Sequence, residues 1–166
     1  MEPPLKLPGS SAGLDPTTGR RRLDPEDMNV MDIASIENSL RLGAPIDCPI
    51  DESGSTLLMN AAFNCRVDLI DFLLKHGAEV DRRKATDGCT ALIVSIQGVH
   101  SRWEERTGHL TDATQRQGMV SWTDLEPIRH LLEADADPNL LILAPSYTVT
   151  PLLFATQLGC GPVVQL

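Results

Sequence analysis

The sequence predicts an all-α repeat solenoid, a stack of helix–turn–helix units, and two recurring patterns support this prediction. In the first, a glycine precedes a short acidic turn, and Gly43 and Gly77 lie 34 positions apart. In the second, a threonine precedes an apolar stretch, and Thr56 and Thr90 also lie 34 positions apart. A period of this length at two kinds of position is typical of repeat proteins, in which each unit buries its apolar face against its neighbours.

The two patterns occur three times each along the chain. The third threonine, Thr150, follows Thr90 by 60 positions instead of one period, so the third unit must contain extra residues. The glycine-type stretches read LRLGAPID (40–47), LKHGAEVD (74–81) and LEADADPN (132–139), and the threonine-type stretches read GSTLLMNAA (54–62), GCTALIVSI (88–96) and TVTPLLFAT (148–156).

Helical signals lie between these stretches. Apolar residues from Val67 to Leu74 recur at spacings of three, four and seven positions, which places them on one helix face. Asp68 near the start and Lys75 near the end suit the helix macrodipole. Gly77 can end the helix because glycine adopts the left-handed conformation without a steric cost. The threonines are predicted to cap the N-termini of the first helices, since a hydroxyl can accept a bond from an unpaired backbone N–H.

Residues 54–81 resemble the ankyrin repeat, a turn followed by two antiparallel helices whose first helix opens with T-P-L-H-x-A. The resemblance covers residues 28–166. It implies a stack of helix pairs joined by β-hairpin fingers. The expected units are 28–50, 51–84, 85–144 and 145–166; the first lacks a recognisable opening helix, and the last is truncated inside its second helix.

The chain departs from the family pattern at identifiable positions. Met59, Ile93 and Leu153 stand where the family has its histidine. Asp135 replaces the glycine that should end the second helix of the third unit, and aspartate tolerates left-handed geometry better than most residues.

Two segments do not fit the repeat. Residues 1–27 are rich in proline and glycine and poor in apolar residues, so they are predicted to form a disordered tail. Residues 99–121 interrupt the third unit between its helices, and the second helix is expected to resume near Asp124. A loop of this length within a compact domain is usually either functional or disordered.

Composition narrows the function class. A net charge of −9 disfavours nucleic acid and anionic membranes as partners, because both require a basic face. The chain shows neither a signal peptide nor a membrane-length apolar run, and its four cysteines form no C-x-x-C pair, which indicates a reducing cytoplasmic or nuclear compartment. The common phosphate-loop, nucleophile and metalloprotease motifs do not occur.

No catalytic residue, cofactor or metal is therefore expected. His100 and His109 lie in the 99–121 segment, with Cys89 upstream, but a closed zinc site needs four suitably spaced ligands, and surface histidine is the favoured interpretation. The alternative, an enzyme or metal-binding domain with a site built in this segment, has no motif to support it.

The favoured hypothesis is a protein-interaction module, such as a scaffold, adaptor or inhibitor, acting as a monomer or as part of a larger chain. The resemblance implies that a partner lies across the fingers and the first helices, on the concave face, and the 99–121 segment is a second candidate. Phe63 and Phe154 are equally open to core packing. Each tryptophan either pins the 99–121 segment onto the stack or contacts a partner; pinning is the favoured interpretation for Trp122, and both remain open for Trp103. The stretch Leu140–Leu143 is expected to be a finger folded under against the 99–121 segment or its neighbour, with an exposed patch as the alternative. The candidate partner-binding residues are Asn60, Phe63, Asn64, Arg66, Arg82, Arg83, Lys84, Gln97, Trp103, Trp122, Phe154 and Gln157.

Overall fold

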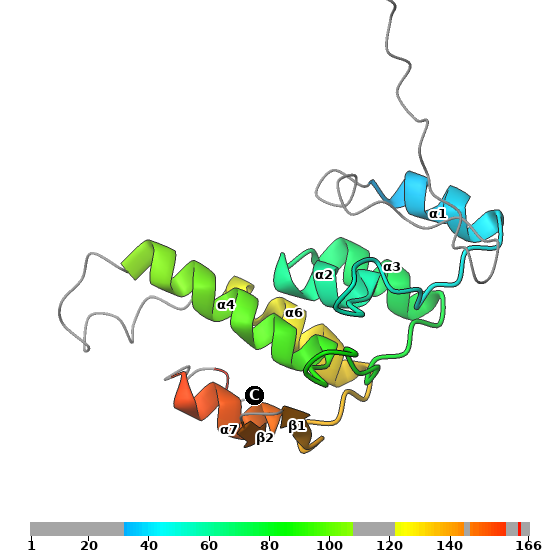
Figure 1. Cartoon of the computed structure of the whole chain (residues 1–166). Coiled ribbons are helices and arrows are strands. Elements are labelled where there is room, and N and C mark those ends of the chain that lie inside the picture. Colours follow the sequence, from blue (N-terminus) through cyan, green and yellow to red (C-terminus); the bar gives the residue numbers. More distant parts are fainter. Residues whose placement is uncertain (1–31, 108–121, 145–146, 159–162, 164–166) are drawn as a thin grey trace, which may run out of the picture.

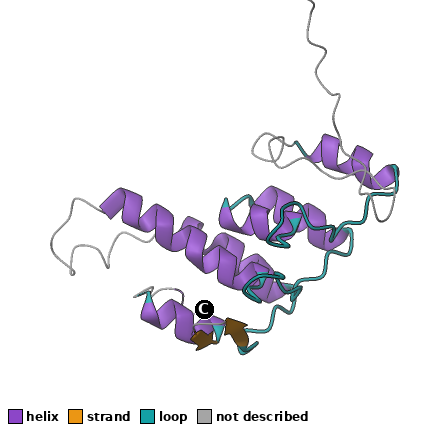
Figure 2. Cartoon of the chain, in the orientation of Figure 1, coloured by secondary structure: helices purple, strands orange, loops and turns teal. Residues whose placement is uncertain are grey.

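The structure, a computed structural model, is a stack of helix pairs and describes residues 32–107, 122–144, 147–158 and 163 (Figures 1 and 2). The predicted all-α repeat solenoid is confirmed. The predicted disordered tail, residues 1–27, lies outside the described residues. In chain order the elements are α1 (Ile33–Arg41), α2 (Leu57–Phe63), α3 (Val67–Lys75), α4 (Ala91–Thr107), α6 (Trp122–Glu133), β1 (Ile142–Ala144), β2 (Tyr147–Val149) and α7 (Pro151–Gln157).

The helices begin where the threonines predict. The Thr56 hydroxyl accepts the backbone N–H of Met59 at 3.3 Å, and the Thr150 hydroxyl accepts that of Leu153 at the same distance. Asp32 caps α1 in the same way, and the backbone N–H of Ser35 lowers the pKa of its carboxyl. The second helices end as predicted in left-handed residues, at Gly43, Gly77 and Asp135, with φ values of 88°, 86° and 64°.

Aspartates at the end of the recurring stretches connect one finger to the next. The Asp47 carboxylate accepts the backbone N–H of Glu79, with both oxygens at 3.2 Å. The Asp81 carboxylate accepts the backbone N–H of Asp137 at 3.2 and 3.3 Å. In both cases, the aspartate binds the finger of the following unit.

The last described finger is a β-hairpin. Strands β1 and β2 are antiparallel, and Ile142 pairs with Val149. Both side chains are buried, and they form a small core cluster with Cys89 and Ile93 of the preceding unit. The apolar stretch 140–143 is thus a finger folded against its neighbour, although Leu141 is exposed.

The main core lies between the two rows of helices. The first helices α2, α4 and α7 form one row, and the second helices α3 and α6 form the other (Figure 1). The largest fully buried side chains come from both rows, so neither helix of a unit could bury its apolar face alone. They include Ile36, Leu58, Ile70, Leu73, Leu92, Ile96, Val99, Leu125, Ile128 and Leu131.

A glycine sets the distance between α2 and α4. A Cβ atom added at Gly98 would lie 2.1 Å from the carbonyl oxygen of Phe63 and 2.9 Å from its carbonyl carbon. The two helix backbones therefore touch at this point, and the contact leaves no space for a side chain.

The structure differs from the sequence prediction in the third unit. Helix α4 has 17 residues, whereas α2 and α7 have 7 each. Residues 99–107 continue this helix, so the described part of the 99–121 segment is helical where a loop was expected; residues 108–121 lie outside the described residues. Helix α6 resumes at Trp122, two positions before Asp124. An apolar face continues through Val99, which is buried in the core, and this keeps the helix packed beyond the length of the repeat.

Replacing Gly98 with alanine should destabilise the protein. In an exposed helix this change would stabilise by about 1 kcal/mol, because alanine has the higher helix propensity. Here the added methyl group must push α2 away from α4, and overpacking of this kind costs about 1–3 kcal/mol. Urea unfolding of Gly98→Ala beside the neighbouring variant Gln97→Ala measures the difference. Equal or greater stability of Gly98→Ala would show that the close approach does not limit the stack.

Candidate partner-binding surface

The first helices place equivalent residues in rows along the stack. Counted from the threonine that precedes each helix, Phe63, Gln97 and Gln157 occupy the same position of α2, α4 and α7. Phe63 and Gln157 are exposed and Gln97 is half-buried. We call the surface formed by these three residues together with Asn60 and Asn64 the first-helix surface. It contains no charged side chain.

A second row of equivalent residues lies nearer the core. Asn60, Val94 and Phe154 share one position of the three helices, and all are half-buried. Phe154 packs against both core clusters, so its ring contributes to the packing of the last unit.

Hydrogen bonds orient the polar residues at the end of α2. The Asn64 side-chain amide donates to the carbonyl oxygen of Asn60 at 3.0 Å and to its Oδ1 atom at 3.1 Å. These bonds hold both side chains in one arrangement at the surface. A preorganised amide pair loses less conformational entropy when a partner binds.

Phe63 is the exposed aromatic residue of this surface. Its side chain is 43% exposed, and its backbone carbonyl accepts a hydrogen bond from the Arg102 guanidinium at 3.0 Å. Arg102 also donates to the Cys65 thiol and thereby fixes the C-terminal end of α2 to α4. Burial raises the pKa of the Cys65 thiol, which the Arg102 charge only partly opposes. The thiol therefore stays neutral near pH 7 and is not a reactive nucleophile.

The predicted cationic residues contact groups within the chain. Arg82 lies 3.3 Å from Glu79, and Lys84 lies 3.6 Å from Asp87. Arg83 donates to the carbonyl oxygen of Leu141 at 2.9 Å and so links two successive fingers. The finger that carries Arg82, Arg83 and Lys84 therefore has part of its positive charge neutralised by groups of the same chain.

Arg66 lies apart from this finger, at the start of α3. Its guanidinium pairs with Asp68 at 2.9 Å, and this hydrogen bond lowers the pKa of the Asp68 carboxyl. Arg66 is half-buried and belongs to the structure of the turn between α2 and α3.

The tryptophans lie on either side of residues 108–121. Trp103 is half-buried on the extended part of α4, with its ring 5.7 Å from that of His100 at an angle of 52°. Trp122 is the first residue of α6, and its side chain lies outside the described residues.

Contacts that the sequence did not predict hold the extended helix and α6 in place. Arg106 pairs with Asp124 through two bonds, at 2.6 and 3.3 Å, and the Asp124 hydrogen bond raises the pKa of Arg106. His130 lies 2.6 Å from Asp71 of α3 and 3.6 Å from Glu126. The Arg106–Asp124 and His130–Asp71 partners are 18 and 59 positions apart in the chain, so no local pattern could reveal these two pairs.

Metal-ligating groups do not cluster in the described part of the chain. No three histidine, cysteine, aspartate or glutamate side chains among these residues lie close enough together to hold an ion. His100 has Glu104 at 3.8 Å, and His109 lies outside the described residues. None of the helices described combines the length and apolar character of a membrane span.

Comparison with known proteins identifies the repeat. Residues 53–82 match the family model of the ankyrin repeat. The chain is also similar to the mouse (Mus musculus) 2-5A-dependent ribonuclease, with 33% identity over 92 residues. This match covers 51% of the chain but only 12% of the mouse protein, so the chain corresponds to a small part of that relative.

The Arg106–Asp124 pair should stabilise the protein measurably. The bond is bidentate, and the Asp124 side chain is only 13% exposed. A double-mutant cycle with Arg106→Met and Asp124→Asn should give a coupling free energy of about 0.5–1 kcal/mol, and less at high salt. The Arg41–Glu37 pair is the control, because it is more exposed and has a single contact at 2.9 Å. Equal coupling in the two pairs would contradict the role assigned to Arg106.

Proposed function

Because this chain is an ankyrin-repeat protein, we propose that it works as a protein-interaction module whose partner lies across α2, α4 and α7. Ankyrin repeats in general bind other proteins. A scaffold, an adaptor and an inhibitor all require a preformed binding surface without a reacting group. The first-helix surface has this character, since its residues are amides and one aromatic ring on rigid helices.

The exposed ring of Phe63 is the observation that supports this proposal most directly. Large aromatic residues are frequent energetic centres of protein interfaces, particularly where polar neighbours surround them. Asn60 lies one turn before Phe63, and Asn64 follows it directly. Arg102 holds the backbone at this point, so a partner would meet an ordered surface.

The extended part of α4 enlarges this surface. It continues past the end of α2 and carries Trp103, and the pairs formed by Arg102 and Arg106 hold it against α2 and α6. In this proposal a partner that crosses α2 and α4 also contacts the extension. Residues 99–107, the helical part of the segment 99–121, would then contact the partner.

The wider properties of the chain agree with a protein partner. A net charge of −9 disfavours nucleic acids and anionic membranes. Cys48, Cys65 and Cys89 form no disulfide within the part of the chain that the structure describes, and we expect the protein to act in the reducing cytoplasm or nucleus. The mouse relative is a ribonuclease by name, but the small share of it that matches gives no reason to assign this activity here.

Replacing Phe63 with alanine should abolish binding of the partner without unfolding the chain. The ring is partly exposed, so its loss should change stability far less than the loss of a buried phenylalanine. Affinity purification with quantitative mass spectrometry, using the full chain as bait, should show a loss of at least ten-fold in partner recovery with Phe63→Ala. The matched control is Leu42→Ala, because Leu42 is also a large exposed apolar residue and lies at the end of α1.

Both baits must first show the same melting temperature as the unchanged chain. Equal recovery of partners with Phe63→Ala and Leu42→Ala would refute binding at this surface. A third bait with residues 108–121 replaced by a Gly-Ser linker tests the adjoining segment. The replacement begins after Thr107 because Arg106 is needed to hold α6.

A further inference from the structure

The amide pair at the end of α2 leaves hydrogen-bonding groups that the described residues do not use. Asn64 donates its side-chain amide to the backbone carbonyl oxygen and to the Oδ1 atom of Asn60. A carbonyl oxygen can only accept, so Asn64 must direct its NH2 group toward Asn60, and Asn60 must present its Oδ1 atom. The Oδ1 atom of Asn64 and the NH2 group of Asn60 form no hydrogen bond within the described part of the chain. The pair therefore offers a ligand one acceptor and one donor, held in place by the bonds between the two side chains.

An acceptor and a donor placed together match the backbone of an extended peptide. In an extended chain the N–H and C=O groups of one residue point to the same side, where a neighbouring strand would otherwise bind them. A helical segment uses these groups for its own hydrogen bonds and could offer the amide pair only side chains. The amide pair therefore favours an extended ligand over a helical one.

Phe63 places an apolar contact beside the amide pair. Asn60, Phe63 and Asn64 are three and four positions apart, which puts their side chains on one face of α2. The Phe63 side chain is 43% exposed, so an apolar side chain of the same ligand can cover its ring. Main-chain hydrogen bonds combined with side-chain contacts of this kind are a common mode of peptide recognition.

The stripe of α4 that faces α2 continues to a carboxylate. The backbone at Gly98 touches the carbonyl group of Phe63, and Arg102 donates to the oxygen of this group at 3.0 Å. Glu105 follows on the next turn of the same stripe, in the part of α4 that continues past the end of α2 (Figure 1). Its side chain is exposed, as is that of Glu104, and no cationic group of the described residues pairs with Glu105. A cation bound to a ligand on Phe63 can therefore reach an unpaired carboxylate.

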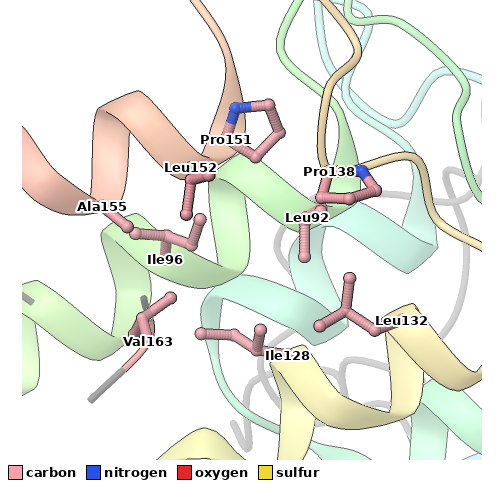
Figure 3. A pocket seen from close by; sticks show the side chains of 9 residues that line it. All are labelled: Leu92, Ile96, Ile128, Leu132, Pro138, Pro151, Leu152, Ala155 and Val163. Carbon is pink, nitrogen blue, oxygen red and sulfur yellow. The ribbon is translucent and has the colours of Figure 1, made fainter. Parts of the chain in front are cut away.

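These groups distinguish the surface around Phe63 from the pocket between α4, α6 and α7. The side chains that line that pocket, such as Leu92 and Ile96 of α4, are all apolar (Figure 3). They offer neither a hydrogen bond nor a charge that would select one class of ligand. The surface around Phe63 offers an aromatic ring, a donor, an acceptor and a carboxylate, and it therefore specifies the chemistry of its ligand.

We propose that this surface binds an extended segment of a partner protein, in which an apolar residue is separated by about three positions from a lysine or arginine. The backbone of the segment bonds to Asn60 and Asn64, the apolar side chain covers Phe63, and the cation lies beside Glu105. Gly98 and Glu105 are seven positions apart in α4, which corresponds to roughly 10 Å, the span of about three extended residues. This inference rests on the function proposed above and adds the chemistry of the partner.

Selection from a phage-displayed library of short random linear peptides, with the full chain as bait, tests the proposal. The enriched sequences should share an apolar residue and a lysine or arginine at the spacing given above. With Glu105→Gln as bait, the basic residue should disappear from the consensus while the apolar residue stays. The matched control is Glu133→Gln, because Glu133 is also an exposed glutamate near the end of a helix, and this bait should return the original consensus.

Fluorescence anisotropy of the labelled consensus peptide then measures the single contacts. Methylation of each backbone nitrogen of the peptide in turn should reveal one position at which affinity falls about three- to ten-fold, because a hydrogen bond to Asn64 is lost. Asn64→Ala should abolish this sensitivity, whereas Asn38→Ala, an exposed asparagine of α1, should retain it. Glu105→Gln should weaken the peptide about two- to five-fold, and less at high salt.

A consensus without a basic residue, or a methylated series in which no position matters, would overturn the proposal. The methylated series uses the unchanged chain, so it decides the question even if Asn64→Ala unfolds. A library from which nothing is enriched would also overturn it. If Phe63→Ala still releases a partner in the affinity purification, that partner binds through a folded surface and the proposed function stands. If neither peptides nor a Phe63-dependent partner are found, the proposed function fails as well.

Discussion

The direct contact between the backbones of α2 and α4 at Gly98 is the constraint on which the stack depends. It brings the first helices close enough for the second helices to pack behind them and bury a continuous aliphatic core. Because the chain has few aromatic residues, this core is filled by leucine, isoleucine and valine, which need close helix spacing to leave no voids. The same spacing lets the fingers meet, and the carboxylates of Asp47 and Asp81 then bind the backbone of the next finger.

Several charged side chains that could otherwise contact a partner form contacts between the elements of the stack. The guanidinium of Arg83 links two fingers, Arg102 fixes α2 to α4, and Arg106 fixes α4 to α6. The first-helix surface is consequently neutral, and its recognition properties come from amides and from one exposed ring. Neutral surfaces of this kind discriminate by shape and hydrogen bonding more than by long-range attraction.

The extended α4 shows how a repeat protein acquires features beyond its repeat. Helix α4 grows longer than its counterparts because Val99 extends the buried face and because Arg102 and Arg106 find partners on neighbouring helices.

The sequence by itself determined the repeat, its period, the helix caps at Thr56 and Thr150 and the left-handed ends at Gly77 and Asp135, because each of these depends on residues within a few positions of one another. It also indicated the first-helix residues, since equivalent positions follow from the period. Only the tertiary structure decided that residues 99–107 are helical, that Phe154 packs in the core while Phe63 is exposed, and that Arg83 and Arg106 are engaged within the chain. These outcomes depend on contacts between residues far apart in the chain, and local sequence patterns contain no information about which distant group a side chain will meet.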